Sequence, residues 1–440
     1  YSTEGDIETV GPSSTPPVSG SLRYRLGRYL EDQNYTFRQL TNLYSMRDIE
    51  QFSLLEPWRR GLAVQMIKDV EESPAWAAVP EDLQCRALAE HNASAWTNRS
   101  LDTERHRDFL DLTSISASDN CETYKKTMGF FTGEALEFEQ TFPLAFSIVI
   151  YKDFQMFELL MRAIYRPQNL YCVHMDNTAT VEFKQRVTNV SGCFENVFLA
   201  SQEVNVRWGT MSAFKPDLVC MQDMLRKGGN WKYFINLTGQ ELPLRTNYEL
   251  VKILRVLDGK NIIECEQYNE DRIKGAGAPP FGVQAIKGSI HSLLARKFVA
   301  FILRNQKSRR IINWAARTYI PDEMTLPTIH CNPSLNAPGG LQEPFRKYRW
   351  EVLQRYKVWG KFGLHPCNGK FVRGICIFGP KDFPTLVGRH ELFVNKFNLD
   401  YNFDVAVCLA DTLMKRHVLE YSNLVEFKTS VYDGYPHKVE

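Results

Sequence analysis

The residues Ala145-Phe-Ser-Ile-Val-Ile-Tyr151 and Leu170-Tyr-Cys-Val-His-Met-Asp176 are two short apolar runs, and the stretch between them has helical spacing. Runs of this length that are rich in β-branched and aromatic residues are typical of buried strands. Between them, residues 154–165 place apolar side chains three or four positions apart, as an amphipathic helix does. The order of strand, helix and strand predicts a βαβ unit with two parallel strands.

The same alternation continues along the chain. The expected elements are a helix at 181–190, a strand at 196–200, a helix near 212–225 with Pro216 close to its start, and a strand at 231–237. This order predicts an α/β domain with a mostly parallel central sheet. Because ligands of such sheets bind at the carboxyl ends of the strands, Asp176 and the loop after Leu237 are candidate site positions.

The composition is that of a well-packed globular protein. The 440 residues can hold one large domain or two ordinary ones, and 44% of them are hydrophobic. The formal charge of +2 argues against a strongly polyanionic partner as the main target, and no dense Lys/Arg stripe indicates nucleic acid binding. No apolar run approaches the ~20 residues that span a bilayer, and no signal peptide is present. Either the protein is soluble or its anchor lies upstream of Tyr1.

The chain divides into three regions by composition. Residues 1–20 are rich in Ser, Thr, Pro and Gly, which predicts a flexible stem. Residues 21–120 are polar with a mostly helical pattern, and their tryptophans indicate that they pack on the rest of the protein. Residues 121–440 are expected to form the α/β domain.

Cysteines and glycosylation motifs indicate an oxidising compartment. The ten cysteines are scattered without a Cys-x-x-Cys pair, which argues against a zinc ribbon or a thioredoxin motif. Their even number, combined with five Asn-x-Ser/Thr motifs, favours the secretory pathway. Asn236 lies in an apolar segment and is expected to be buried. The remaining N-glycosylation candidates are Asn34, Asn92, Asn98 and Asn189.

Several common catalytic motifs are absent. The chain has no G-x-x-x-x-G-K-[ST], no G-x-G-x-x-G after the first strand, no His-Glu-x-x-His and no G-x-S-x-G. Asp-x-Asp, the usual metal clamp of nucleotide-sugar enzymes, is also missing. Asp176 is followed by Asn-Thr-Ala, so no second carboxylate is near it in the sequence.

One acidic motif lies in the last third of the chain. In Trp314-Ala-Ala-Arg-Thr-Tyr-Ile-Pro-Asp-Glu323 an apolar, helical stretch ends at a proline, and two carboxylates follow at once. This order predicts a rigid turn that can direct Asp322 or Glu323 into a cleft. A solvated acidic turn is the alternative interpretation.

The α/β segments and this motif resemble, in order, the β-1,6-N-acetylglucosaminyltransferases of the core 2 and I-branching type. The resemblance covers roughly residues 115–415. Each matching piece is unspecific alone, but the ordered set is specific. The pieces are residues 146–151, 160–176, 192–201, 230–247, 319–323, 371–379 and 392–397.

The resemblance implies a GT-A-like fold and an inverting, metal-independent transfer of GlcNAc from UDP-GlcNAc. It implies the Golgi lumen as location, a type II membrane anchor, and a mucin-type O-glycan as acceptor, with core 1 converted to core 2. Glu323 would be the base that removes the proton of the acceptor hydroxyl. Arg373 and Lys396 would stabilise the departing pyrophosphate in place of a metal. An ordinary surface charge is the alternative for each cation.

The remaining site residues also follow from the resemblance. Val149, Tyr151, Asp176 and Trp208 would bind the donor, although a strand-end acid and apolar strand residues can equally be structural. The residues implied for acceptor binding are Glu264, Arg272 and Trp359. Here the chain departs from the family pattern, because a family cation is replaced by Asn269 and the loop from Trp359 to Cys367 is about half as long. These departures leave the acceptor open.

Eight cysteines match family positions, and the resemblance implies their pairing. The implied bridges are Cys85–Cys408, Cys121–Cys193, Cys172–Cys220 and Cys367–Cys376. Cys265 and Cys331 are additional, and a fifth bridge between them is one possibility.

Three other functions are weighed against this one. Peptide O-xylosyltransferases, which use UDP-xylose, are similar in broad fold, but the close segment matches favour the GlcNAc enzymes. A carbohydrate-binding relative without catalysis would explain the altered acceptor loop, but not the retained Glu323, Arg373 and Lys396. A glycoside hydrolase would need two carboxyls about 5–9.5 Å apart across a bond, which the neighbouring Asp322 and Glu323 do not favour.

Overall fold

A computed structural model describes Ser73, Ala117, Tyr435 and residues 120–268, 270–343, 353–360, 366–421 and 426–433. The predicted stem at 1–20 lies outside the described residues. So does the predicted helical region 21–120, apart from Ser73, Ala117 and Asn120.

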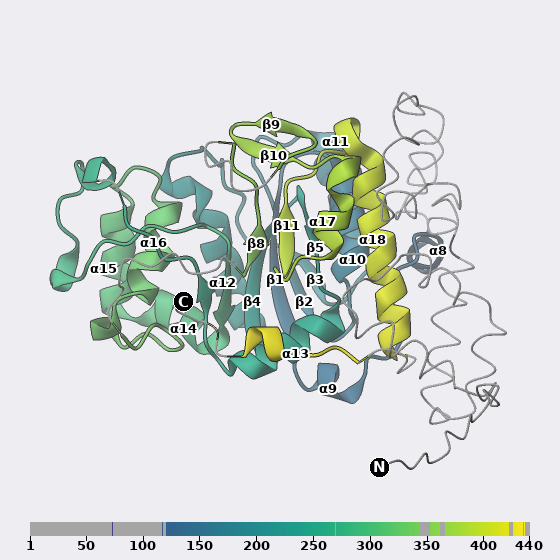
Figure 1. The fold of residues 1–440 in the computed structure, drawn as a ribbon, viewed down its shortest axis with the longest axis horizontal. Helices are drawn as coiled ribbons and strands as arrows, with labels where there is room; N and C mark the ends of the chain where they lie inside the picture. Colours follow the sequence, from purple (N-terminus) through teal and green to yellow (C-terminus); the bar gives the residue numbers. More distant parts are fainter. Residues whose placement is uncertain are drawn as a thin grey trace, which may run out of the picture.

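The centre of the fold is a six-stranded sheet in the order β3-β2-β1-β4-β7-β6 (Figure 1). Its first four strands are parallel, and the predicted βαβ alternation is confirmed with boundaries close to those expected. These strands are β1 (Leu144–Ile150), β2 (Leu170–Met175), β3 (Val197–Leu199) and β4 (Tyr233–Thr238). The helices that connect them are α10 (Phe154–Ile164), α11 (Val181–Gly192) and α12 (Lys215–Lys227).

Shorter strands extend this framework. β7 (Ser292–Ala295) and β6 (Ile262–Ile263) complete the central sheet and are antiparallel to their neighbours. A second sheet has the order β5-β11-β8 and consists of β5 (Glu241–Pro243), β11 (Phe393–Asn395) and β8 (Arg355–Tyr356). β9 (Lys370–Val372) and β10 (Ile375–Ile377) form an antiparallel hairpin at the top of Figure 1.

Other helices cover the two faces of the sheet. In Figure 1, α14, α15 and α16 gather at one end of the molecule, whereas α10, α17 and α18 lie on the other side of the sheet. The α-helices not yet bounded are α8 (Cys121–Thr127), α9 (Glu137–Gln140), α13 (Asn247–Leu257), α14 (Arg296–Arg304), α15 (Gln306–Ala315), α16 (Asp322–His330), α17 (Phe383–Val387) and α18 (Leu399–Tyr421). Short 3₁₀ helices span Met211–Ala213, Glu270–Ile273, Pro280–Gly282, Pro333–Leu335, Pro380–Asp382 and Ser430–Tyr432. None of the described helices combines the length and apolar composition that crossing a bilayer requires.

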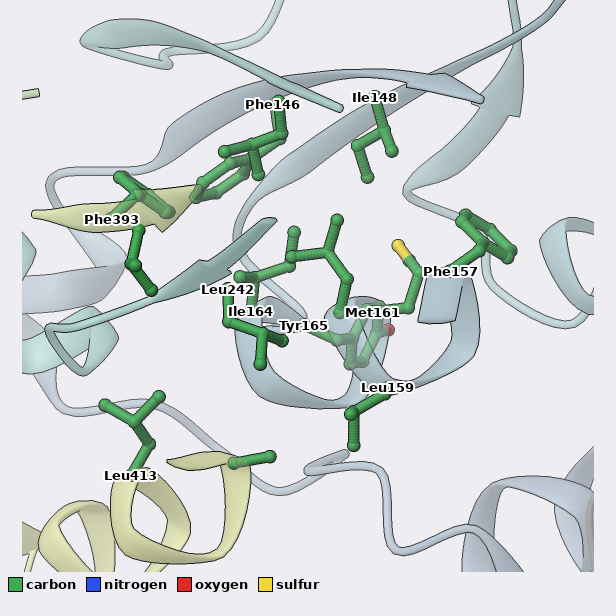
Figure 2. Packing of buried hydrophobic residues seen from close by; sticks show 14 of the residues in the cluster. Phe146, Ile148, Phe157, Leu159, Met161, Ile164, Tyr165, Leu242, Phe393 and Leu413 are labelled. Carbon is green, nitrogen blue, oxygen red and sulfur yellow. The ribbon is translucent and has the colours of Figure 1, made fainter. Parts of the chain in front are cut away.

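The strands bury both of their faces because successive side chains point to opposite sides. Phe146 and Ile148 of β1 belong to one apolar cluster, whereas Ala145 belongs to the other. Figure 2 shows the first cluster, in which Phe157 and Met161 of α10 pack beneath β1. These four large side chains are fully buried, and each such side chain contributes about 1.5–3 kcal/mol to folding.

Four disulfides lie within the described residues. Three have the partners that the resemblance implies, namely Cys121–Cys193, Cys172–Cys220 and Cys367–Cys376. The fourth joins the two additional cysteines, Cys265 and Cys331. Cys408 of α18 is also disulfide-bonded, but its predicted partner Cys85 lies outside the described residues.

The glycosylation motifs differ in accessibility. Asn236 is buried in β4, where its side chain bonds to Asp217, the Ile290 carbonyl and the Ser292 amide. Its expected burial is therefore confirmed. Asn189 is half-buried on α11, and the candidates Asn34, Asn92 and Asn98 lie outside the described residues.

Candidate active site

The carboxyl ends of β1 and β2 bring three of the predicted donor residues to one edge of the sheet. The Asp176 amide donates to the Ile150 carbonyl at 2.9 Å, so the residue after β2 lies beside the end of β1. Val149 is half-buried near that end, and its carbonyl accepts from Gly239 at 3.2 Å. Tyr151, directly after the strand, is exposed.

The Asp176 carboxylate is bonded within the protein. Oδ1 accepts from the Thr178 amide at 2.7 Å and its hydroxyl at 2.6 Å, and Oδ2 accepts from the Val206 amide at 2.8 Å. Burial alone would raise the pKa of Asp176, but these hydrogen bonds outweigh it and lower the pKa. The carboxylate therefore fixes the loop leading to Trp208.

His174, two residues before Asp176, accepts a hydrogen bond from the Val204 amide at 3.0 Å, as a packed histidine does.

Trp208 meets an aromatic residue to which the sequence assigned no role. Trp208 and Tyr319 are 71% and 55% exposed, and their rings are perpendicular with centroids 6.1 Å apart. Tyr319 precedes Ile320, whose φ of 56° is a left-handed conformation that β-branched residues rarely adopt. Backbone strain of this kind concentrates at functional sites. Tyr319 lies within the quoted acidic motif, but only the structure reveals its pairing with Trp208.

The two carboxylates of the acidic motif begin α16. Pro321 is the N-cap and Asp322 and Glu323 are the first helical residues, so the expected rigid turn is in fact the first turn of a helix. Acidic side chains are favourable there because the helix dipole is positive at this end. Burial, and to a lesser extent the charge of Glu323, raises the pKa of Asp322 to about 6.

Glu323 lies against Arg272, which the resemblance assigned to the acceptor. The Glu323 Oε2 atom is 2.8 Å from Arg272 Nη1. Both atoms are buried, and neither makes an aligned hydrogen bond. The backbone amide of Tyr319 donates to the Arg272 carbonyl at 2.8 Å, which ties the two segments together. The structure thus brings the predicted base and a predicted acceptor residue into direct contact.

Arg373 occupies the tip of the β9–β10 hairpin. Val372 pairs with Ile375, so Arg373 and Gly374 form a two-residue turn, and their φ angles are 53° and 81°. Positive φ at both positions is the type I′ geometry of tight hairpins. An arginine there costs about 1–2 kcal/mol relative to glycine. The Cys367–Cys376 disulfide joins this hairpin to the segment before it.

Lys396 follows β11 and is influenced by the charge of Arg373. Partial burial lowers the pKa of Lys396, and the positive charges of Arg373 and Lys152 lower it further. The two predicted cations are therefore close enough to interact. Lys152 is a third cation at this site that was not predicted, and it directly follows Tyr151 at the strand end.

The other two predicted acceptor residues lie near an unpredicted lysine. Burial raises the pKa of Glu264, and the positive charge of Lys357 opposes that rise. The Lys357 ammonium donates to Ser289 Oγ at 3.0 Å and lies 6.0 Å from the ring of Trp359. Trp359 pairs with Ile375 of β10, so it lies beside the hairpin that carries Arg373. Asn269 lies outside the described residues.

Gly288 joins the segment of Glu264, a predicted acceptor residue, to the helix that carries Glu323, the predicted base. Its amide donates to the Glu323 carbonyl at 2.8 Å. A Cβ atom at this position would lie 1.9 Å from the Glu264 carbonyl oxygen and 2.7 Å from Pro327 Cγ, so only glycine fits. The Cys265–Cys331 disulfide makes a second link between the same two segments.

None of the predicted site residues belongs to a side-chain cluster that could hold a metal ion within the described part of the chain. Among the described residues, one group of His, Cys, Asp or Glu side chains is close enough to hold a metal: Cys265, His330 and Cys331. The two sulfurs of that group are joined in a disulfide. Neither Asp176 nor Glu323 belongs to such a group within the described part of the chain.

Comparisons with known proteins agree with this architecture. A family model described as Core-2/I-branching enzyme matches residues 144–387. The human beta-1,3-galactosyl-O-glycosyl-glycoprotein beta-1,6-N-acetylglucosaminyltransferase is 33% identical over 335 residues, which is 70% of this chain and 76% of the relative. A bovine enzyme of the same name, numbered 3, is 30% identical over 82% of this chain and 88% of its own length. An enzyme of Bovine herpesvirus 4 is 30% identical over 76% and 83%, respectively.

The fold and the family match define a glycosyltransferase with a GT-A-like architecture, which implies a nucleotide-sugar donor and a glycan acceptor. The chain belongs to the Core-2/I-branching enzyme family and is a β-1,6-N-acetylglucosaminyltransferase.

Proposed function

We propose that the protein transfers GlcNAc from UDP-GlcNAc to core 1 of a mucin-type O-glycan, forming core 2, in the Golgi lumen. The contact between Glu323 and Arg272 is the observation that carries the catalytic part, because it places a base candidate beside an acceptor-binding candidate. The acceptor is inferred from the names of the relatives, which act on β-1,3-galactosyl-O-glycosyl-glycoproteins. The disulfides support an oxidising compartment.

In this mechanism Glu323 removes the proton of the acceptor's 6-hydroxyl group. The hydroxyl oxygen then forms a bond to the anomeric carbon of GlcNAc from the face opposite to the leaving group. The bond between that carbon and the UDP oxygen breaks, UDP departs, and the configuration is inverted. Arg272 would hold the acceptor and keep the Glu323 carboxylate in position.

Charge on the departing diphosphate is stabilised by the cations at the sheet edge. Arg373 offers a planar fork of donors and Lys396 a compact charge. Because Arg373 is held in a hairpin turn, it is positioned before the charge develops, which is how preorganised groups lower a barrier. We propose that this arrangement makes a divalent metal unnecessary.

The remaining candidates bind the substrates. Val149, Tyr151 and Asp176 would form the nucleoside end of the donor site, with Trp208 beside the sugar. Glu264 and Trp359 would hold the acceptor together with Arg272. Three contacts support this division: Trp208 meets Tyr319 of the motif that carries Glu323, Arg272 contacts Glu323, and Trp359 pairs with Ile375 in the hairpin of Arg373.

The test is an acceptor panel with labelled UDP-GlcNAc, comprising core 1, core 3 and linear poly-N-acetyllactosamine. We expect product with core 1, a β-1,6 linkage by linkage analysis, and unchanged turnover in EDTA. When UDP-xylose competes with UDP-GlcNAc, we expect no transfer of xylose. Transfer to core 3 or poly-N-acetyllactosamine without transfer to core 1 would overturn the acceptor assignment, and loss of turnover in EDTA would overturn metal independence.

A further inference from the structure

The segment 296–317 has an unusual charge balance. It contains seven Lys or Arg residues and no Asp or Glu, whereas the whole chain has 53 basic and 51 acidic residues. The net charge of +2 hides this concentration, because acidic residues elsewhere compensate for it. A near-neutral net charge therefore does not exclude a polyanionic partner at this segment.

The structure places most of these cations on one outer surface. On α14 and α15, Phe298, Ile302, Ile311 and Trp314 are buried against the sheet-facing core. Arg296 at the start of α14 lies over the Trp231 ring, whereas the other charged residues of both helices are exposed. The exposed cations, which we call the cationic surface, are Lys297, Arg304, Lys307, Arg309, Arg310 and Arg317.

The cationic surface lacks acidic partners. None of its six side chains forms an ion pair with a carboxylate of the described residues. Surface lysines elsewhere do so, as in Lys125–Glu122 at 2.8 Å and Lys184–Glu203 at 2.5 Å. Like charges three or four residues apart on a helix are destabilising by about 0.2–0.5 kcal/mol per pair, so folding alone does not favour this arrangement.

An exposed aromatic ring lies among these cations. Phe281 is 44% exposed, and its ring centroid is 5.9 Å from Lys307 Nζ and 5.7 Å from Arg310 Cζ. Its φ of 67° is left-handed, which is unfavourable for a bulky residue. A strained, exposed ring between two cations without carboxylate partners is a feature of binding surfaces rather than of a solvated face.

The cationic surface continues into the acceptor side of the active site. Trp314 of α15 donates from Nε1 to the Gly277 carbonyl at 2.9 Å, so α15 packs on the loop that follows Arg272. Arg317 is exposed between α15 and Tyr319, and Glu323 begins the next helix. Figure 1 shows α14, α15 and α16 together at this end of the molecule.

We propose that the cationic surface binds carboxylate or sulfate groups on glycans of the glycoprotein whose O-glycan is the acceptor. This inference rests on the proposed function. Guanidinium groups bind such anions with paired hydrogen bonds, and the uncompensated charge would attract an acidic glycoprotein and lower its KM. An anionic membrane fits less well, because binding to a bilayer needs several exposed apolar side chains. In the described part, the exposed large apolar side chains near these cations are Phe281 and Tyr319, and the Tyr319 ring meets Trp208 at the active site.

The test compares Lys307→Glu/Arg310→Glu with a matched control, Lys215→Glu/Lys381→Glu, which reverses two exposed charges elsewhere. The acceptors are a sialylated or sulfated mucin glycoprotein that also carries free core 1, and a neutral core 1 glycoside. We expect the KM for the acidic glycoprotein to rise about tenfold in the first variant at low salt. The kcat values and the KM for the glycoside should stay within about twofold. The difference should vanish at about 0.5 M salt, where surface charges are screened.

Direct binding separates this inference from the proposed function. Retention of the acidic glycoprotein on immobilised protein, measured without donor, tests the surface even if core 1 proves to be the wrong acceptor. Equal KM and equal retention in the charge-reversed variant and the control would overturn the inference. So would a variant that loses binding only to vesicles containing anionic phospholipid, because the partner would then be a membrane. Thermal unfolding of both variants checks that they fold.

Discussion

The proposed donor side and the proposed acceptor side of this site are stabilised in different ways. On the donor side, Asp176 ends a central strand and its carboxylate accepts three hydrogen bonds. Arg373 lies on a two-residue turn next to a disulfide that the family resemblance implied. On the acceptor side, the segment around Glu264 packs against α16 through Gly288 and through the additional Cys265–Cys331 bridge.

This difference separates the features that local sequence determines from those that depend on contacts between distant segments. Val149, Tyr151 and Asp176 lie at the ends of two central strands and Arg373 lies in a two-residue turn, so local patterns determine the positions of these four residues. The acceptor residues depend on contacts between segments far apart in the chain, such as Arg272 with Glu323 and Lys357 with Ser289. We therefore expect this enzyme to differ from other members of its family mainly on the proposed acceptor side. The following experiments test this difference between the two sides.

The largest effect is expected from Glu323→Gln, which keeps the shape of the side chain but removes its basicity. General-base catalysis contributes about 10²–10⁴-fold, so kcat should fall by that factor. The affinity for UDP, measured by calorimetry, should not change, because the donor cations are untouched. Undiminished transfer would refute the role of Glu323. Asp322→Asn, at the neighbouring carboxylate, serves as the control and should retain most activity.

Removal of the donor cations should produce the next largest loss. Arg373→Asn is suited to the test because asparagine tolerates the left-handed backbone of this turn while lacking the charge. Loss of one such stabilising group costs about 10²–10³-fold in kcat. Lys396→Met, which keeps the apolar stem, should behave similarly.

For both substitutions UDP affinity should fall as well, which distinguishes them from Glu323→Gln. Thermal unfolding should be unchanged for Arg373→Asn. A loss of activity that is matched by unfolding would show instead that the hairpin has only a structural role.

The core of the fold is predictable because its signals are local. Apolar runs and helical spacing located β1 to β4 and α10 to α12 to within a few residues. The second sheet was not predicted, because its strands are two or three residues long and its partners are distant in sequence. Glu241–Pro243, for example, pairs with Phe393–Asn395. A period cannot be recognised in so few residues.

The site shows the same limit. Glu323, Arg272 and Arg373 were each predicted, but no sequence pattern indicated the 2.8 Å contact between the first two. Lys152 could have been predicted from the sequence, because it follows Tyr151 at a strand end, where ligands of such sheets bind. Lys357 carries no such signal, since it follows the two-residue strand β8 and reaches Ser289 only through tertiary packing.

Removal of the additional disulfide should weaken acceptor binding without weakening donor binding. In Cys265→Ser/Cys331→Ser we expect the acceptor KM to rise several-fold, because the Glu264 segment is no longer fixed to α16. The UDP affinity should stay within about twofold. Stability should fall by about 2–4 kcal/mol, measured by denaturant unfolding.

Cys121→Ser/Cys193→Ser is a matched control for that variant. It opens a loop of similar length, with a sequence separation of 72 against 66, but the lost bridge joins α8 to the residue after α11. The control should lose similar stability and keep its acceptor KM. An equal rise of KM in both variants would show that the bridge acts through general stability.

The smallest effects concern pH, and the contributions of Asp322 and Asp176 to stability should depend on pH in different ways. Asp322 has a pKa of about 6 when folded and about 3.8 when unfolded, so folding favours its protonated form. This contribution to stability is complete below about pH 4 and is lost as the pH rises through about 6. The asparagine side chain of the Asp322→Asn variant cannot ionise, so the variant should gain about 1–3 kcal/mol relative to the wild type between about pH 4 and 7.

Asp176 should behave in the opposite way, because hydrogen bonds lower its pKa below the unfolded value. Its contribution is present above about pH 4 and is lost as the pH falls, so Asp176→Asn should be destabilised by a constant amount between about pH 4 and 7. Denaturant unfolding of both variants at about pH 4, 5, 6 and 7 measures the two trends. Parallel pH profiles would contradict this expectation, because they would mean that Asp176 and Asp322 have the same electrostatic environment.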